Sequence, residues 1–275
     1  MKITYFGTSA SEAWPAMFCN CEACKKAREL REKNLRTRHQ ALIDESLLLD
    51  FPPDTNYHIQ QYGLDLRKVK TLLVTHSHPD HFYPFDLANR SSQFTNGKSN
   101  LEILDIYGNA AVKKLFFSAM EGFEGIDTVI RFHEIAPFDT FATTDGYSVT
   151  ALEADHEKRE QSLIYKIEKN HKQILFAHDT GIFPEATWEY LRGNYFDYIS
   201  LDCTGLLHDW RSGHMGFKAV KMTCERLRRM NCIDDNTIVA LSHFAHGDGL
   251  THERITEIAE KSGYIAAYDT FACEV

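Results

Sequence analysis

The sequence predicts an α/β fold in which mixed β-sheets carry helices on their outer faces. Short β-rich runs recur along the whole chain; they follow one another in the first half and alternate with helical patterns in the second half. The 275 residues, of which 43% are hydrophobic and 25% charged, supply enough apolar material for a large core. No solenoid-length repeat or low-complexity linker divides the chain, so one domain over 1–275 is expected.

The individual elements follow from local pattern. Runs rich in β-branched, aromatic and leucine residues predict strands over 2–6, 41–50, 69–75, 101–107, 149–154, 163–168, 173–177, 198–202, 237–242 and 264–268. Helical spacing predicts helices over 22–33, 84–89, 110–120, 184–191, 216–230 and 251–262. Thr251 suits the N-cap of the last helix, and Glu253 lies in its first turn.

Charge and hydropathy exclude several classes of protein. A net charge of −9 and a pI near 5.9 argue against a nucleic-acid partner held by a broad basic surface. No apolar run approaches the roughly 20 residues that cross a bilayer, and the first residues lack the apolar core of a signal peptide. We therefore expect a cytoplasmic protein without a membrane partner. The sequence leaves the oligomeric state open, and a homodimer is only the commonest prior.

A cluster of histidines follows the predicted strand 69–75. In His76-Ser77-His78-Pro79-Asp80-His81, side chains two apart on an extended segment share a face, so His76 and His78 can reach one ion. Pro79 then bends the chain, which lets Asp80 and His81 point toward a second position. Imidazoles with a carboxylate suit zinc, manganese or iron. The alternative is a chance grouping of histidines in a polar loop.

One loop cannot complete two coordination spheres, so further ligands must come from later strand ends. His156, Asp179 and His243 each directly follow a predicted strand. Taken singly, each residue fits a surface or hydrogen-bonding role better than a ligand role. Taken in order after the first cluster, they become candidate ligands.

The ordered set of His-x-His-x-Asp-His, a later histidine, Asp-Thr-Gly and a final Ser-His resembles the metallo-β-lactamase superfamily. The resemblance spans nearly the whole chain, and it implies an αββα four-layer sandwich with the site at one edge of two sheets. It also implies two divalent ions, zinc or manganese, at that site. The implied ligands are His76, His78 and His156 for one ion, Asp80, His81 and His243 for the other, and Asp179 for both.

A narrower resemblance comes from Cys19, Cys21 and Cys24. This motif is similar to the extra cysteine motif of the phosphoribosyl cyclic phosphodiesterases of the carbon–phosphorus lyase pathway. In that family the thiolates hold a structural zinc with a histidine three residues beyond the last active-site histidine, which here is His246. Such a zinc would link the loop at about 14–30 to the loop carrying His243. The alternatives are a trio of reduced thiols beside a helix start, or a redox role.

The resemblance places the family's proposed acid/base histidine at His214, which has a glycine before it and another two residues later. The alternative is a histidine near the start of the helix 216–230. Arg211, in a distinctive loop over 207–211, and Lys158, beside His156, are candidate phosphate contacts, with solvated surface charges as the alternative. His178, next to Asp179, departs from the family's small polar residue.

These assignments predict a metal-dependent hydrolase, with a small, cyclic phosphodiester as substrate. Two ions would bridge a water and lower its pKa, giving a hydroxide nucleophile. His214 would protonate the leaving oxygen, and Asp80 and Asp179 would act as ligands. The rivals are a lactonase or thioesterase of the same fold, and a non-catalytic accessory protein of cofactor biosynthesis. A β-lactamase fits the absent signal peptide poorly, and a tRNA-processing nuclease needs a basic RNA-holding element.

Overall fold

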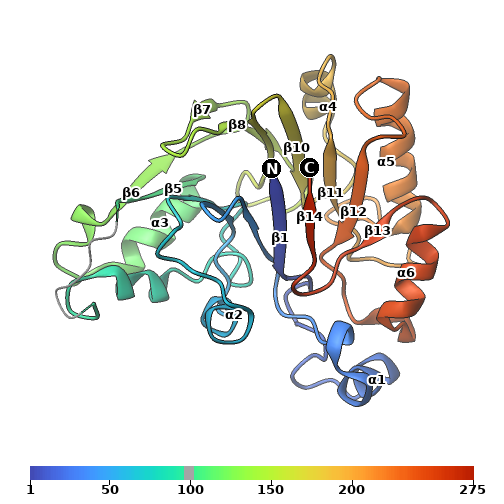
Figure 1. Ribbon diagram of the computed structural model, residues 1–275, viewed down its shortest axis with the longest axis horizontal. Coiled ribbons are helices and arrows are strands. Elements are labelled where there is room, and N and C mark those ends of the chain that lie inside the picture. Colours follow the sequence, from blue (N-terminus) through green and yellow to red (C-terminus); the bar gives the residue numbers. More distant parts are fainter. Residues whose placement is uncertain (96–101) are drawn as a thin grey trace.

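The computed structural model describes residues 1–95 and 102–275. Within them, two mixed seven-stranded sheets face each other (Figure 1). The first has the order β14-β1-β2-β3-β4-β5-β6. Its strands are β1 (Lys2–Gly7), β2 (Gln40–Ile43), β3 (Leu47–Leu49), β4 (Thr71–Leu73), β5 (Leu104–Gly108), β6 (Ile130–Glu134) and β14 (Ala272–Glu274).

The second sheet has the order β13-β12-β11-β10-β9-β8-β7. Its strands are β7 (Thr140–Ala142), β8 (Ser148–Glu153), β9 (Leu163–Lys169), β10 (Lys172–Ala177), β11 (Tyr198–Asp202), β12 (Ile238–Ser242) and β13 (Ile265–Ala266). Strands β10 to β13 run parallel to one another, whereas β7 to β10 pair antiparallel. The change from hairpins to parallel crossovers confirms the mixed sheets expected from the sequence.

Helices cover both outer faces (Figure 1). Their bounds are α1 (Glu22–Leu30), α2 (Thr55–Tyr62), α3 (Ala110–Ala119), α4 (Glu185–Leu191), α5 (Phe217–Arg229) and α6 (His252–Glu260), with 3₁₀ turns η1 (Glu32–Asn34), η2 (Pro84–Arg90), η3 (Ile126–Thr128) and η4 (Gly247–Gly249). α2 and α3 accompany the first sheet, and α4, α5 and α6 line the second. The αββα four-layer sandwich is therefore confirmed.

The four layers follow from alternation along the strands. In β10, Ile174 and Phe176 join the apolar cluster between the two sheets, while Leu175 and Ala177 join the cluster beneath α4, α5 and α6. A third cluster packs Val112 and other apolar residues between the first sheet and α3. Because successive side chains of a strand point to opposite faces, a strand buried on both faces must be apolar at nearly every position.

The structure corrects several predicted elements. The single strand over 41–50 is wrong: β2 and β3 form a hairpin whose turn places Asp44 and Glu45 at positive φ, without the Asn-Gly or Asp-Gly pair that signals such turns. The helix over 84–89 is a 3₁₀ helix. The strand over 101–107 begins at Leu104, and residue 101 lies outside the described residues. The prediction also missed α2, β6, β7 and β14.

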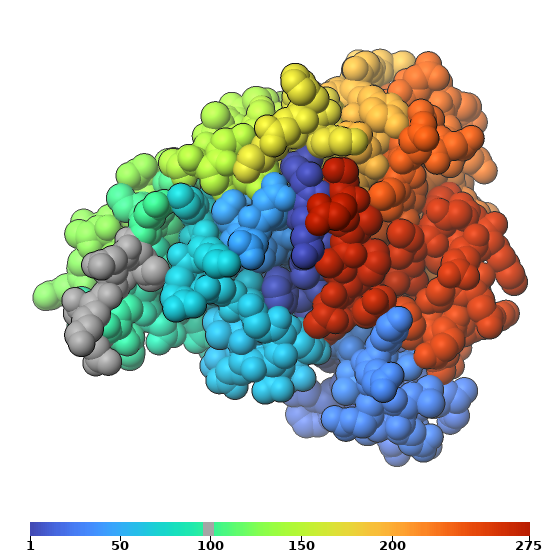
Figure 2. Space-filling model, viewed as in Figure 1, coloured from blue at the N-terminus to red at the C-terminus, as the bar shows by residue number. Residues whose placement is uncertain are grey.

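In the space-filling view, the segment around α1 lies against the C-terminal part of the chain (Figure 2). This places the cysteine-bearing loop beside η4, which follows β12. Within 1–95 and 102–275, no helix combines the length and apolarity needed to span a bilayer.

Candidate metal centre

The loops that follow β4, β8, β10 and β12 meet at one edge of the sandwich. His76, His78 and His156 form one group there, with potential ligand atoms all within 4.8 Å of one another. The Nε2 atom of His156 lies 3.4 Å from Nδ1 of His78. The ring centroid of His76 lies 4.4 Å from that of His78 and 4.8 Å from that of His156. Three imidazoles from two distant segments thus converge as the sequence predicts.

A second group contains Asp80, His81 and His243. The Nε2 atom of His81 lies 3.2 Å from Nε2 of His243 and 3.3 Å from Oδ2 of Asp80. His81 and His243 are fully buried, and Asp80 is nearly so. The loop after β4 therefore divides its side chains between two groups, with His76 and His78 in one and Asp80 and His81 in the other.

Asp179 lies between the two groups. Its Oδ2 atom is 2.7 Å from Nε2 of His81 and 3.0 Å from Nε2 of His243, whereas its Oδ1 atom is 3.6 Å from Nε2 of His156. Each carboxylate oxygen faces a different group. Nε2 of His76 is buried without a hydrogen-bond partner among the described residues, and the neighbours of Oδ2 of Asp179 are the Nε2 atoms of His81 and His243. Buried acceptors aimed at one another are costly unless a cation satisfies them, so this donor set fits bound metal.

The other ring nitrogens of these imidazoles are held by hydrogen-bond acceptors. Nδ1 of His81 donates to Oδ2 of Asp50 at 2.7 Å, and Nδ1 of His156 donates to the Gly213 carbonyl at 2.9 Å. Nδ1 of His243 lies 2.8 Å from Oγ1 of Thr204. These contacts keep each Nε2 lone pair directed at the cluster, as metal-ligating histidines require.

The remaining two imidazoles are held in the same way. Nδ1 of His76 lies 3.0 Å from Oγ1 of Thr75, which leaves Nε2 facing the cluster. His78 is reversed, because its Nε2 lies 3.3 Å from Oε2 of Glu157 and its Nδ1 faces His156. Glu160 fixes the backbone of this loop by accepting hydrogen bonds from the Ser77 amide and hydroxyl.

Sequence reasoning missed these partners. For Asp50 the sequence gives only a weak indication of such a role, because it is an acidic residue at the end of an apolar run. For Thr204 and Gly213 the sequence gives no indication, because only the folded chain brings them to His243 and His156.

Three site residues have left-handed backbone conformations: φ is 62° at Asp50, 49° at Asp179 and 61° at His243. Residues other than glycine rarely adopt this region, and such strain concentrates at functional sites. Each of the three lies just after a strand, in the loops that meet at the cluster.

Burial and charge perturb the acids and bases of the cluster. Burial depresses the pKa of His76 well below its usual value. Burial opposes protonation of His81 also, but the carboxylates of Asp179, Asp80 and Asp50 outweigh it and raise the pKa of His81. In spite of burial, the neighbouring imidazoles of His243 and His81 hold the pKa of Asp179 well below its usual range. The cluster therefore combines anionic oxygens with imidazoles in a dry setting, which favours cations.

His214 borders both groups without belonging to either triad of predicted ligands. Its ring centroid lies 4.9 Å from that of His156 and 5.7 Å from that of His243, and its Nδ1 is 3.1 Å from Oδ2 of Asp202. Burial lowers the basicity of His214, but the Asp202 carboxylate outweighs it and raises the pKa of His214 to about 9. The amides of Thr204 and Met215 donate to Asp202. The predicted acid/base residue is thus held beside the cluster.

The residues predicted to contact phosphate lie farther out. Arg211 forms a paired contact with Asp209, at 2.7 and 2.8 Å, and Lys158 is exposed. Their roles stay predictions. His178 points into the buried layer between the sheets, where its Nε2 lies 2.7 Å from Oγ of Ser200 and its ring 4.2 Å from that of His39.

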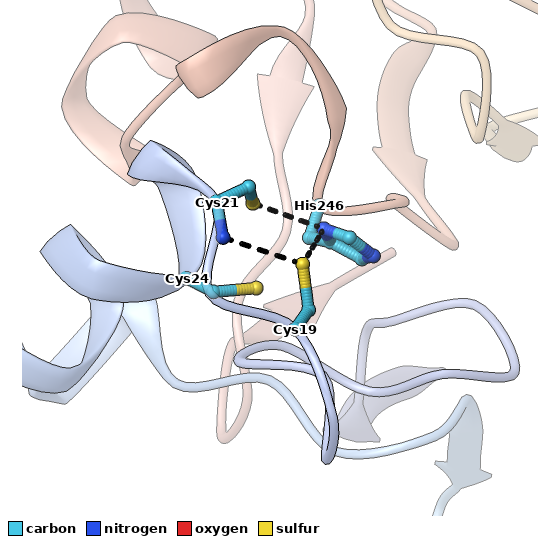
Figure 3. Close-up of side chains that lie close together, drawn as sticks. All are labelled: Cys19, Cys21, Cys24 and His246. Atoms are coloured by element: carbon cyan, nitrogen blue, oxygen red, sulfur yellow. Dashed lines mark hydrogen bonds between the residues drawn. The ribbon is translucent and has the colours of Figure 1, made fainter.

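The cysteine motif and His246 form a separate cluster (Figure 3). Nδ1 of His246 lies 3.5 Å from Sγ of Cys21 and 3.8 Å from Sγ of Cys19, and Cys24 completes the group. Such spacings suit one tetrahedral ion with bonds of about 2.0–2.3 Å. Although burial opposes it, hydrogen bonds from the Cys24 amide and His246 lower the pKa of Cys21 to about 6. The structure thus brings together the four residues predicted to hold zinc.

Comparison with known proteins identifies the family. Residues 47–244 match the family described as the beta-lactamase superfamily domain. The chain belongs to the beta-lactamase superfamily. This is a hydrolase superfamily whose fold implies divalent metal binding, and the His and Asp groups described above are the candidate metal sites of this member.

Curated relatives of this superfamily member include ribonucleases Z. Ribonuclease Z of Streptococcus agalactiae serotype V is 29% identical over 161 residues, which are 57% of this chain and 47% of that protein. Ribonuclease Z of Pediococcus pentosaceus is 28% identical over 151 residues, which are 53% of this chain and 47% of that protein. The matches thus cover about half the length of these relatives.

Solved structures of the superfamily share the fold along the whole chain. A diphosphatase of the PhnP family has a TM-score of 0.74 at 21% identity, covering 100% of this chain and 97% of that chain. Zinc-bound PqqB from Methylobacterium extorquens also has a TM-score of 0.74, at 17% identity, and covers 100% of each chain. The short form of human tRNase Z has a TM-score of 0.66 at 15% identity, covering 100% of this chain and 99% of that one.

Proposed function

We propose that this hydrolase is a phosphodiesterase that uses two divalent metal ions, zinc or manganese, to cleave small phosphodiesters, cyclic ones included. The observation that carries the proposal is the Asp179 carboxylate, whose Oδ1 faces His156 while its Oδ2 faces His81 and His243. One carboxylate between two imidazole groups is the donor arrangement that holds two neighbouring cations.

The proposed ligands divide as the two groups do. One ion would take His76, His78 and His156, the other Asp80, His81 and His243, and both would share Asp179. Bound together, two such ions supply a nucleophile by lowering the pKa of water, and they offset the negative charge that grows on phosphoryl oxygens. The acceptors behind the imidazoles, such as Asp50 behind His81, hold the outer ring nitrogen and so orient Nε2 toward the ion that it would bind.

His214 is the proposed general acid. Its Nδ1 is tied to Asp202, so the ring is oriented and its Nε2 remains to donate a proton to the leaving ester oxygen. Asp80 and Asp179 are engaged as ligands, which removes them as free bases. Lys158 and Arg211 are proposed phosphate contacts at the rim, and Arg211 would have to exchange Asp209 for substrate.

Cys19, Cys21, Cys24 and His246 are the proposed ligands of a structural zinc. Such a Cys₃His set is closed and leaves no position for substrate. Because His246 follows His243 by three residues, the zinc would fasten the loop that supplies a ligand of the active site. Nε2 of His246 lies 3.6 Å from Oε1 of Glu12, which would orient the ring.

The choice of a phosphodiester is supported by the names of the relatives, since a ribonuclease cleaves phosphodiesters. The same names favour a second candidate, an RNA-processing nuclease. The net charge of −9 favours small substrates over RNA. We also expect a cytoplasmic protein without a membrane partner, and a homodimer is the commonest prior for its assembly. Cleavage of a precursor tRNA at rates above those for small diesters would support the second candidate.

The test is a panel of bis(p-nitrophenyl) phosphate, lactones and thioesters, assayed on protein loaded with manganese or zinc. We expect phosphodiester hydrolysis, its loss in His81→Ala and Asp179→Ala, and no change in His133→Ala. His133 is a matched control, because its imidazole also pairs with a carboxylate, that of Asp105, but in the first sheet away from the cluster. Wild-type activity in either ligand variant would refute the dinuclear centre, and hydrolysis of lactones or thioesters alone would refute the phosphodiester assignment.

A further inference from the structure

An exposed tryptophan lies beside the candidate centre in the loop between β11 and α5. Trp210 is 46% exposed, and its ring centroid lies 6.4 Å from that of His214. Leu207 in the same loop is 56% exposed. Neither residue belongs to the ligand groups or to the apolar cores. The position of Trp210 next to the candidate centre leaves almost half of a large aromatic ring open to a ligand of that centre.

The loop holds this ring in a fixed place. A Cβ atom at Gly205 would lie 3.1 Å from three atoms of Trp210, so the absence of a side chain there lets the indole rest on the backbone. The Gly216 amide donates to the Trp210 carbonyl at 3.1 Å, and the Ile182 amide donates to the Arg211 carbonyl at 2.8 Å. The indole is therefore preorganised although almost half of it faces solvent.

Asp248 fastens the same loop from the other side. Its Oδ2 accepts from the Leu207 amide at 3.1 Å, and its Oδ1 lies 3.2 Å from Nε2 of His208. The His208 imidazole stacks beside Trp210, with centroids 5.7 Å apart and an interplanar angle of 19°. Two flat rings thus stand in nearly parallel planes at the edge of the candidate centre.

The charged side chains of this loop form ion pairs. Asp209 pairs with Arg211 and also with Lys218, at 2.8 Å. The flat faces of Trp210 and His208 are therefore the parts of this loop that can contact a ligand without breaking an ion pair. A flat face suits a nucleobase, because every base presents a π-face that stacks on an aromatic ring regardless of its hydrogen-bonding pattern.

We propose that Trp210, with His208 beside it, is the platform on which the nucleobase of the substrate stacks, so that the enzyme acts on nucleotide phosphodiesters. The inference rests on the proposed function: the phosphodiester would occupy the metal groups, His214 would stand at the leaving oxygen, and a sugar would span the gap to the indole. Base–aromatic stacking corresponds to a contribution of about 5- to 150-fold in affinity.

The test compares two diesters with the same leaving group, thymidine 5′-(p-nitrophenyl phosphate) and methyl p-nitrophenyl phosphate. In Trp210→Ala we expect KM for the thymidine diester to rise about 5- to 150-fold with little change in kcat. The methyl diester should react as in wild type, which also shows that the variant folds. Trp210→Phe should restore most of the loss, and Gly205→Ala, which displaces the indole, should reproduce part of it.

Phe117→Ala removes another exposed aromatic ring, on α3, and is the control that should change neither substrate. Equal KM changes for both diesters, or none in Trp210→Ala, would overturn the platform while leaving the phosphodiesterase assignment intact. A wild-type enzyme that hydrolyses neither diester would overturn the proposed function, and the platform with it.

Discussion

The Asp50→Asn substitution tests whether the centre depends on the residues behind its ligands. Oδ2 of Asp50 accepts from Nδ1 of His81 at 2.7 Å, and Oδ1 accepts from the Thr75 amide at 2.8 Å, with all three residues buried. An asparagine has one acceptor oxygen. In either orientation its NH₂ group faces a donor, so it loses the His81 contact or the Thr75 contact.

The size of the effect follows from that geometry. Without the carboxylate, the His81 proton is free to move to Nε2, the atom that faces Asp179 and His243. Substitutions of this kind cost about 10- to 100-fold in metal affinity or activity, equivalent to about 1.4–2.7 kcal/mol. We expect the metal affinity of Asp50→Asn to fall by this factor, and kcat for bis(p-nitrophenyl) phosphate to fall with it at fixed metal concentration.

The assay is competition against a chromophoric chelator for zinc or manganese, with steady-state kinetics on the same preparations. Asp105→Asn is the matched control, because Oδ1 of Asp105 lies 2.8 Å from Nε2 of His133 and Asp105 is equally buried, yet the pair lies outside the metal groups. Its metal affinity should match that of wild type. If Asp50→Asn bound metal and turned over substrate within twofold of wild type, the orienting role of Asp50 would be rejected.

Two further predictions concern the cysteine cluster and acid stability. Cys21→Ser should remove one zinc per chain in elemental analysis and lower the melting temperature. The control Cys273→Ser, in β14, should do neither. An unchanged zinc content in Cys21→Ser would rule out the structural site. Burial depresses the pKa of His58 to about 3, so the neutral form belongs to the folded state, and the stability it contributes is present above pH 6.5 and lost as the pH falls toward 3. We therefore measure the free energy of unfolding in urea for wild type and His58→Gln between pH 6 and 4. The free energy of wild type should fall relative to that of the variant by about 1.4 kcal/mol for each pH unit. Parallel pH profiles of the two proteins would contradict this reasoning.

Local signals predicted the parts of the site that are adjacent in the chain. The spacing within His76 to His81 and within Cys19 to Cys24 is a property of neighbouring residues, and the structure keeps each set together. The sequence also predicted the strands that precede the ligands, because strands buried on both faces must be apolar at nearly every position. The single strand expected over 41–50 failed, since Asp44 and Glu45 adopt a turn conformation that their residue types do not announce.

The sequence by itself determined the fold class and the residue types available to the centre, because periodicity and residue chemistry are local. Only the tertiary structure decided how those residues meet. Asp179 reaches His81 because strands from two sheets end at one edge, and Asp50 reaches His81 because β3 and β4 are neighbouring parallel strands. Contacts between residues tens to hundreds of positions apart in the chain depend on how the layers pack. Local sequence patterns do not predict which of these residues meet.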